Sequence, residues 1–325
     1  MTFPFNACLA AFAAALACSW LSLPLWRAWC LRRGWVDDPG HRKIHDHPIA
    51  LAGGLSVLTG LLVPLLAALA AVHWQWLEAD ALEKLRYGFG KRSGQLIAIF
   101  AGAFGMWLLG WLDDRHELRP LPKFAGQFLI AALVAAAGVR ITVFVPSLLF
   151  SYAVTILWIL TVTNACNFMD NMNGLCAGLG VISAGGFGLV AVRQGQYLVA
   201  SIAFLIAGAS FGFLPHNFPR AKAFLGDAGS HLLGYLLAVL AILPHFYSAK
   251  HPRPLAVLTP LLLLALPLGD LVWVVMLRWR LGKPFYVGDN NHLSHRLVRR
   301  GFSRVTAVLL IWLLAAALGA LAFLL

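Results

Sequence analysis

Long apolar stretches recur along the whole chain and constrain its fold more than any other feature. We count ten, centred near residues 15, 60, 101, 132, 153, 185, 205, 238, 265 and 314. A membrane-spanning helix needs roughly 20 apolar residues. Only 12% of the residues are charged, whereas a soluble domain carries about 25%. We therefore expect an all-α, polytopic membrane protein of about ten transmembrane helices, with residues 1–325 forming a single domain.

The charged residues are distributed unevenly between the two sides of the expected bundle. Ten spans place 17 Lys and Arg residues on one side and 8 on the other. Because basic residues favour the cytoplasmic side, the first side is expected to face the cytoplasm, with both termini periplasmic. Topology and contact with anionic membrane lipids then account for the net charge of +12. No soluble domain is large enough to make nucleic-acid binding a reasonable expectation.

Polar residues gather in five segments on the expected cytoplasmic side. They are GWVDDPGHRKIHDHPIALAGG (34–54), GWLDDRHELRPLPKFAGQ (110–127), TNACNFMDNMNGLCAG (163–178), LPHNFPRAKAFLGDAGS (214–230) and VGDNNHLSHRLVRRGFS (287–303). Ten of the 13 acidic residues also lie on this side or at its membrane edge. The preference of basic residues for the cytoplasm does not explain these acids. Five converging polar segments therefore predict an active site that faces the cytoplasm.

Asp113 and Asp114 follow the apolar run MWLLGWL directly. A carboxylate costs about 2.5–3.5 kcal/mol at the centre of a bilayer and less near the interface. We expect Asp113 and Glu117 to share a helical face, with Asp114 turned about 100° away. One acid could then hold a metal while its neighbour transfers a proton. A solvated helix end is the simpler alternative.

Asp227 lies in FLGDAGS, between two glycines that would let the backbone come close to a ligand. Magnesium usually takes one or two carboxylates and completes its coordination with water and phosphate oxygens. Asp227 together with Asp113 or Asp114 would suit Mg²⁺ bound to a diphosphate. Asp227 could also cap the helix that follows.

Four asparagines and an aspartate follow the apolar run that ends at Thr163. If the helix continues, Asn164, Asn167 and Asn171 form one polar stripe beside Asp170. Such residues are unfavourable inside a helix and need a reason to be there. Amides next to a carboxylate could bind a nucleoside or orient the ligands of a metal, whereas capping would use only one of the asparagines.

Two basic clusters complete the set of candidate residues. His292 and His295 stand three residues apart and are followed by Arg296, and the sequence does not suggest a third zinc ligand. Binding of phosphate oxygens is the better interpretation, although a plain cytoplasmic basic cluster would also account for the arginines. A second cluster, Arg42, Lys43 and His45, precedes a Gly-Gly pair. Acids, cations and amides at one membrane edge together suggest phosphoryl transfer between a nucleotide and a lipid.

These segments resemble the polyprenyl-phosphate N-acetylhexosamine-1-phosphate transferase family, which belongs to glycosyltransferase family 4. DDPGHRKIH is similar to the start of its GlcNAc-1-phosphate transferase branch, and WLDDRHEL with a following lysine to its Asp-Asp motif. NACNFMDNMNGL is similar to its Asn-x-x-Asn-x-x-Asp-Gly-x-Asp-Gly motif. AFLGDAGS resembles its magnesium motif and HLSHRL its terminal histidine motif. The motifs follow the family's order from Asp37 to Gly301.

The resemblance implies a role for each matching residue. Asp113 and Asp114 match the catalytic pair, and Asp227 matches the residue that binds Mg²⁺, for which Mn²⁺ could substitute. The residues implied in substrate binding are Asn167, Asp170, Asn173, Asn217, Arg42, Lys43, His45, Lys123, His292, His295 and Arg296.

The resemblance also implies a reaction, a place and partners. A UDP-sugar, such as a UDP-N-acetylhexosamine, would give its sugar 1-phosphate to undecaprenyl phosphate, with release of UMP. The product would initiate a cell-envelope glycan of the O-antigen, capsule or teichoic-acid type. The enzyme would lie in the bacterial inner membrane with its active site facing the cytoplasm, and relatives often form homodimers.

Four positions depart from the family's motifs. Asn171 replaces a glycine, Asn173 replaces an acid, Ser294 replaces the middle histidine of His-x-His-His, and Ala50 replaces a common proline. The three acids of the expected site are present, so we expect an active enzyme with altered sugar specificity. The alternatives are a secondary transporter, or a catalytically altered paralogue that acts as a scaffold. Transporters, however, place polar residues near mid-membrane in two repeated halves, and no matching half is evident here.

Overall fold

The computed structural model is helical, with one two-stranded hairpin. It describes residues 5–38, 47–76, 79–142, 145–244, 254–284, 286–287 and 289–324, with residues 79–89, 91 and 254 described by their backbone alone. The helices are α1 (Phe5–Arg33), α2 (Gly53–His73), α3 (Ala79–His116), α4 (Pro120–Ala136), α5 (Leu148–Met169), α6 (Leu175–Arg193), α7 (Tyr197–Asn217), α8 (Gly226–Leu240), α9 (Thr259–Leu263), α10 (Ala265–Arg280), α11 (Leu293–Arg299) and α12 (Arg304–Ala322), with a short 3₁₀ helix, η1 (Pro254–Leu258). The hairpin consists of β1 (Val36–Asp37) and β2 (Ile49–Ala50).

The expectation of an all-helical membrane protein is confirmed. In the described part of the chain, seven helices are long and apolar enough to cross a membrane. The number is eight if the segments Leu255–Leu263 and Ala265–Arg280, which meet at a bend of 72°, count as one span. All ten apolar centres expected from the sequence fall within helices. Fewer than the expected ten spans are found because α4 has only 17 residues and α8 only 15, whereas a straight span needs roughly 20.

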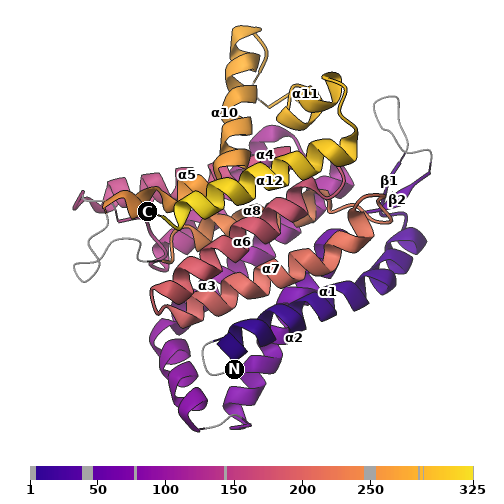
Figure 1. Cartoon of the computed structure of the whole chain (residues 1–325). Helices are drawn as coiled ribbons and strands as arrows, with labels where there is room; N and C mark the ends of the chain where they lie inside the picture. The colour runs from indigo at the N-terminus through magenta and orange to yellow at the C-terminus, as the bar shows by residue number, and fades with distance from the viewer. Residues whose placement is uncertain are drawn as a thin grey trace.

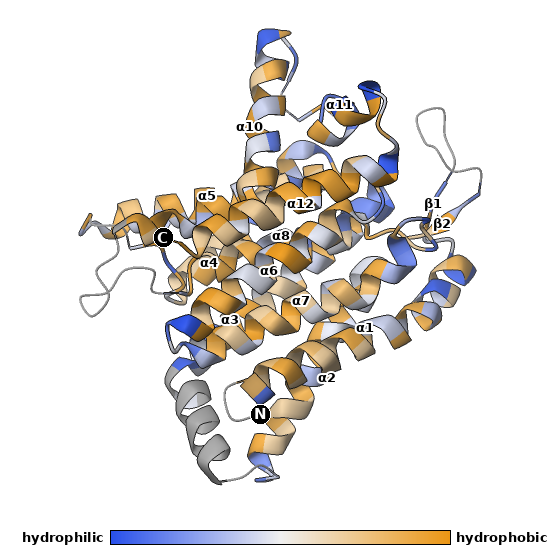
Figure 2. Cartoon of the chain, in the orientation of Figure 1, coloured by the Kyte–Doolittle hydropathy of each residue, from blue (hydrophilic) through white to orange (hydrophobic). Residues whose placement is uncertain are grey.

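The main helices run side by side, so that one end of the bundle differs from the other. In Figure 1, α1 begins near the lower centre and α12 ends on the left, while the hairpin and α11 lie towards the upper right, at the opposite end of the bundle. Hydrophobic residues cover the middle of the helices, and hydrophilic residues gather around the hairpin and α11 (Figure 2). This polar end brings together segments that are far apart in the sequence.

Helix α8 forms the centre of the bundle, because its residues 228–240 are all buried. Glycines let its neighbours approach closely. A Cβ on Gly102 or Gly110 of α3 would meet α8 atoms at less than 3.0 Å, and a Cβ on Gly234 would meet the backbone of α5. Other helices therefore enclose α8, which has only 15 residues.

Helices α1 and α7 pack through two glycines one turn apart. A Cβ on Gly208 would collide with the carbonyl oxygen of Phe12, and a Cβ on Gly212 with that of Leu16. Small residues spaced in this way allow helix backbones to come together in a membrane, where packing rather than hydrophobic burial drives association.

The hairpin attaches the start of α2 to the segment that leads into α8. Val36 pairs with Ala50 in β1 and β2, and Ala50 in turn accepts a hydrogen bond from the Phe224 backbone N–H at 2.9 Å. Gly53 and Gly54 donate to the carbonyls of residues 224 and 225. A side chain at either glycine would meet the residues around α8 at less than 3.0 Å. The Gly-Gly pair therefore permits close backbone packing beside the polar end.

Two expectations about helix continuation were wrong. α5 ends at Met169, so Asn171 does not extend a stripe with Asn164 and Asn167. The poor helix formers after it end the helix, and Gly174 has a φ of 76°. α3 ends at His116, and Glu117 has a φ of 45°. Glu117 therefore does not share a helical face with Asp113.

Candidate functional site

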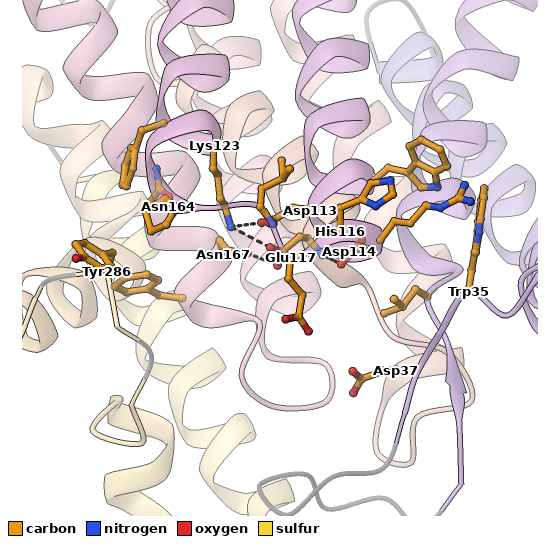
Figure 3. Close-up of a pocket in the computed structure, with 18 of the residues that line it drawn as sticks. Trp35, Asp37, Asp113, Asp114, His116, Glu117, Lys123, Asn164, Asn167 and Tyr286 are labelled. Carbon is orange, nitrogen blue, oxygen red and sulfur yellow. Dashed lines mark hydrogen bonds and ion pairs between the residues drawn. The ribbon is translucent and has the colours of Figure 1, made fainter.

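A lysine joins two carboxylates from different helices at the polar end of the bundle. Lys123 of α4 places its Nζ 2.5 Å from Asp113 Oδ2 of α3 and 2.9 Å from Asp227 Oδ2 of α8 (Figure 3). Asp113 Oδ1 also accepts from the backbone N–H of Leu118 at 2.9 Å. The three charged groups are largely shielded by protein, which strengthens their interaction relative to one in water. This triad of charged side chains forms the centre of the candidate site.

The neighbouring carboxylate, Asp114, has a different environment. Its two oxygens accept from the backbone N–H groups of Asp227 at 2.7 Å and Ala228 at 3.0 Å. These N–H groups lie in the first turn of α8, where they have no acceptor within the helix and a negative charge is favoured. Asp114 therefore caps α8, a role that the sequence could also have given to Asp227. Gly226 makes the contact close, because its φ is 72° and a Cβ there would lie 2.7 Å from Asp114.

This difference leads to opposite expectations for the two adjacent acids. Asp114→Asn puts an amide group against one N–H of α8, so it should lower the unfolding free energy by about 1–2 kcal/mol, the usual cost of losing a cap. Asp113→Asn leaves the cap intact and should cost more activity than stability. Unfolding temperature and transfer rate, measured on both variants in detergent, test this. Equal effects of both variants on both quantities would contradict the division.

Asparagines of α5 hold the site from the side. Asn167 donates through Nδ2 to Asp227 Oδ1 at 2.7 Å and to Ser230 Oγ at 3.0 Å. One turn earlier, Asn164 donates to the side chain of Gln127 at 2.7 Å. Asn164 and Asn167 thus share a face towards α4 and α8, as the sequence predicts. Asn167 orients the Asp227 carboxylate from the side opposite Lys123.

Two cavities meet at these acids. The larger has a volume of about 1620 Å³ and the smaller about 720 Å³, and Asp114 and Asp227 line both. The larger one has an apolar wall from α5 and α10, made of Leu157, Leu160, Leu271 and Val275. Glu117 also lines it, with its carboxylate extending away from the Lys123 ion pairs (Figure 3).

The smaller cavity gathers the residues that follow α5. Asp170 and Asn173 both line it, and Asn173 Nδ2 donates to the carbonyl of Pro219 at 3.3 Å. Burial, together with the negative charges of Asp227 and Asp114, raises the pKa of the Asp170 carboxyl well above its usual range. Asn217 is buried and joins two backbone segments, accepting from Gly174 N at 2.5 Å and donating to Ala223 O at 2.8 Å. It holds the 170–174 loop in place.

Helix α11 brings two histidines to the same cavity. His292 and His295 line it, and His292 Nδ1 lies 2.6 Å from Asp270 Oδ2 of α10. The other Asp270 oxygen accepts from Leu293 N at 2.6 Å and so fixes the start of α11. Burial, and after it the positive charge of nearby groups, lowers the pKa of His295 below its usual value.

The remaining expected residues lie apart from this centre. The Arg296 guanidinium lies 4.3 Å from the ring centroid of Trp273 on α10. Arg296 is not one of the described residues that line the two cavities. Arg42, Lys43 and His45 lie outside the described residues. Asp37, which precedes that segment, lines both cavities.

Two charged residues of α10 that contribute to the site were not predicted from the sequence. Asp270 holds His292, and the buried Arg278 lies 2.7 Å from Asp289 through its Nε, with its guanidinium 5.0 Å from the Phe168 ring centroid. The signal was available, because ionisable residues within an apolar helix are costly and usually functional. Both residues interrupt the apolar run ALPLGDLVWVVMLRWR.

The site offers suitable ligands for a divalent cation. Asp113, Asp227 and His231 each present a ligand atom within 4.8 Å of the others. The ammonium of Lys123 already lies between the two carboxylates, at a position that favours positive charge. Carboxylate oxygens are the ligands that Mg²⁺ prefers, so the donor set fits this metal.

Fold and site together define a helical membrane protein with an ion-paired acidic centre where two cavities meet. Residues 96–245 match the profile of glycosyl transferase family 4. The chain is 30% identical to a probable undecaprenyl-phosphate N-acetylglucosaminyl 1-phosphate transferase of Bacillus subtilis, covering 94% of this chain and 81% of that protein. It is 35% identical to the decaprenyl-phosphate N-acetylglucosaminephosphotransferase of Mycobacterium tuberculosis, covering 89% and 76%.

A third relative, the undecaprenyl-phosphate alpha-N-acetylglucosaminyl 1-phosphate transferase of Escherichia coli K12, is 28% identical, with coverage of 89% and 76%. The chain belongs to glycosyl transferase family 4. It is therefore an enzyme, and the resemblance seen in the motifs is confirmed.

Proposed function

We propose that this enzyme transfers a sugar 1-phosphate, such as N-acetylglucosamine 1-phosphate, from a UDP-sugar to undecaprenyl phosphate and releases UMP. The observation that carries the proposal is the position of Asp113, Lys123 and Asp227 where two cavities of different character meet. A transferase that joins a water-soluble donor to a lipid acceptor needs such a junction. The names of the relatives supply the sugar and the polyprenyl carrier.

The two cavities suit the two substrates. The apolar wall between α5 and α10 would accommodate the start of a polyprenyl chain, because it is open to the hydrophobic side of the bundle, with Leu157 65% exposed. The smaller cavity combines Asp170, Asn173, His292 and His295. Amides and a carboxyl group suit a nucleoside, and imidazole N–H groups suit phosphate oxygens.

The reaction joins the two phosphates directly in our proposal. An oxygen of the lipid phosphate forms a bond to the β-phosphorus of the donor. The bond from that phosphorus to the bridging oxygen breaks, and UMP leaves with the electron pair. Asp113 would take the proton of the lipid phosphate, because both oxygens of Asp114 cap α8 through backbone N–H groups, whereas only one oxygen of Asp113 accepts from the backbone and the other meets the Lys123 side chain. Lys123 would balance the negative charge that gathers between the substrates.

Asp227 would hold Mg²⁺, with Asp113 close enough to share it; Mn²⁺ could replace it. Such an ion neutralises charge on phosphate oxygens and acts as a Lewis acid. Asn167 orients the carboxylate that would bind it. Arg42, Lys43 and His45, which the resemblance implies in substrate binding, lie outside the described residues.

We also propose ten spans, with both termini periplasmic and the site facing the cytoplasm across the bacterial inner membrane. The common end at which α1 begins and α12 ends (Figure 1), away from the polar cluster, is in keeping with an even number of crossings. The basic charge near the polar end favours the cytoplasm on that side. The lipid-linked product would begin a cell-envelope glycan, and the enzyme would act as a homodimer.

Purified protein tests the proposal when it is mixed with Mg²⁺, undecaprenyl phosphate and a panel of UDP-sugars. We expect UMP release that requires the lipid phosphate and is greatest with UDP-N-acetylglucosamine. Omitting the lipid provides the control for hydrolysis. A folded preparation that releases no UMP with any sugar would favour the scaffold alternative, and uptake of a sugar into vesicles without UMP release would favour a transporter. Mass measurement in detergent checks the homodimer.

A further inference from the structure

Two of the positions at which this chain departs from its family's motifs are in direct contact. The hydroxyl of Ser294 on α11 donates to Asn171 Oδ1 at 2.6 Å. They lie 123 residues apart in the sequence, so nothing local requires the contact. Ser294 is fully buried, and a buried hydroxyl without a partner would be costly. The two unusual residues therefore satisfy each other.

The Asn171 amide makes a second hydrogen bond that fixes its orientation. Its Nδ2 donates to the carbonyl oxygen of Phe168 at 2.6 Å, in the last turn of α5. The amide nitrogen of Asn171 thus caps the end of α5, and its amide oxygen accepts the hydrogen bond from α11. The Phe168 ring also lies 5.6 Å from the ring of His292, centroid to centroid. The end of α5 and the histidine helix are therefore packed as one unit.

The contact connects the two walls of the smaller cavity. On one side, the 170–174 loop carries Asp170 and Asn173. On the other side lie His292, the N-cap residue of α11, and His295 of α11. Asp270 of α10 holds the start of α11 by its contacts with His292 Nδ1 and Leu293 N, whereas Ser294 attaches α11 to the loop. The distance between the histidines and Asp170 consequently depends on the Asn171–Ser294 contact.

Glycine at 171 and histidine at 294, the residues that the family's motifs imply, would fill the same space differently. Glycine at 171 lacks an acceptor for Ser294 and leaves a gap, whereas histidine at 294 would direct a ring towards the volume that the Asn171 amide occupies. Each change alone is mismatched with the residue that remains, either by a lost hydrogen bond or by overpacking. Both changes together exchange one complementary pair for another.

We propose that Asn171 and Ser294 are a matched pair of positioning residues that sets the spacing between the histidine helix and the nucleotide loop, and so the fit of the sugar-nucleotide donor. The inference rests on the proposed donor site in the smaller cavity. Neither residue need touch the reacting atoms. Their effect is on donor affinity, because within the described part of the chain neither residue hydrogen-bonds to Asp113, Lys123 or Asp227.

A double-mutant cycle tests the pair, with Asn171→Gly, Ser294→His and the double variant assayed for UMP release. We expect each single variant to raise the donor KM about tenfold, equivalent to ~1.4 kcal/mol, with a much smaller change in kcat. The double variant should return to within about threefold of the wild-type KM, since residues in contact couple strongly. Single effects that simply multiply in the double variant would overturn the proposal.

Ser183→Ala supplies the matched control. Its buried hydroxyl donates to Leu263 O at 2.7 Å, between α6 and α9, so it should lower the unfolding temperature and leave the donor KM unchanged. A KM rise equal to that of the single variants would show a general effect of destabilisation and refute a positioning role. If wild-type protein releases no UMP, the proposed function fails, and the pair is judged by the same cycle in unfolding temperature, where additivity would refute it.

Discussion

Replacing Asp227 with asparagine is expected to reduce sugar-1-phosphate transfer by about 10³-fold, the upper range for removing one preorganised electrostatic group. Asparagine preserves the shape of the side chain but removes the charge that faces Lys123 at 2.9 Å. It also places an amide nitrogen or a neutral oxygen opposite Asn167. Both metal binding and the orientation of the site should suffer. Initial rates of UMP release, with the amount of folded enzyme measured in parallel, provide the test.

Metal binding gives an independent measurement of the same variant. Wild-type protein should bind Mn²⁺, detected by electron paramagnetic resonance, and Asp227→Asn should weaken that binding by at least tenfold. Asp289→Asn is the control for metal binding alone, because its carboxylate lines the smaller cavity but pairs with Arg278 rather than with the triad. Retention of both activity and Mn²⁺ binding in Asp227→Asn would refute the assignment of this residue to the metal.

Replacing Gly110 with alanine is expected to lower activity by about 10²-fold, although only one methyl group is added. In an isolated helix alanine would be favoured by about 1 kcal/mol. Here the Cβ would meet the backbone of residues 227 and 228 at less than 3.0 Å. α3 and α8 would have to separate, which moves Asp113 and Asp114 away from Asp227. A displacement of about 1 Å can cost that much in rate.

Gly185→Ala is the matched control, since this glycine of α6 has no atom within 4 Å of a Cβ. It should leave activity unchanged, while Gly110→Ala should also lower the unfolding free energy by about 1–3 kcal/mol through overpacking. Rates and unfolding temperatures of both variants decide the matter. Normal activity in Gly110→Ala would mean that the spacing between α3 and α8 does not control the site.

Much of the candidate site was predictable because its residues end apolar runs. Asp113, Asp114 and Asp227 each interrupt or adjoin a hydrophobic segment, where a charge is costly. The charge asymmetry of the loops places them on one side. These are local signals, and hydropathy alone carries them. The same rule would have found Asp270 and Arg278, had it been applied within α10.

The different structural roles of neighbouring residues were not predictable from such local signals. Asp113 and Asp114 are adjacent and chemically identical, yet one meets Lys123 and the other caps α8. The end of α5 at Met169 removes Asn171 from the expected stripe and brings it to Ser294. Such differences depend on which helix lies alongside, and contacts over a hundred residues apart leave little trace in a single sequence.

By itself, the sequence determined that this chain is a helical membrane protein with its acids, amides and histidines gathered in a few polar segments, since apolar length and the distribution of charge are properties of each segment alone. Only the tertiary structure decided which of those side chains meet. Close helix packing at Gly110 and Gly226 brings Asp113 and Asp114 to α8, and it does so because two backbones can approach closely only where side chains are absent.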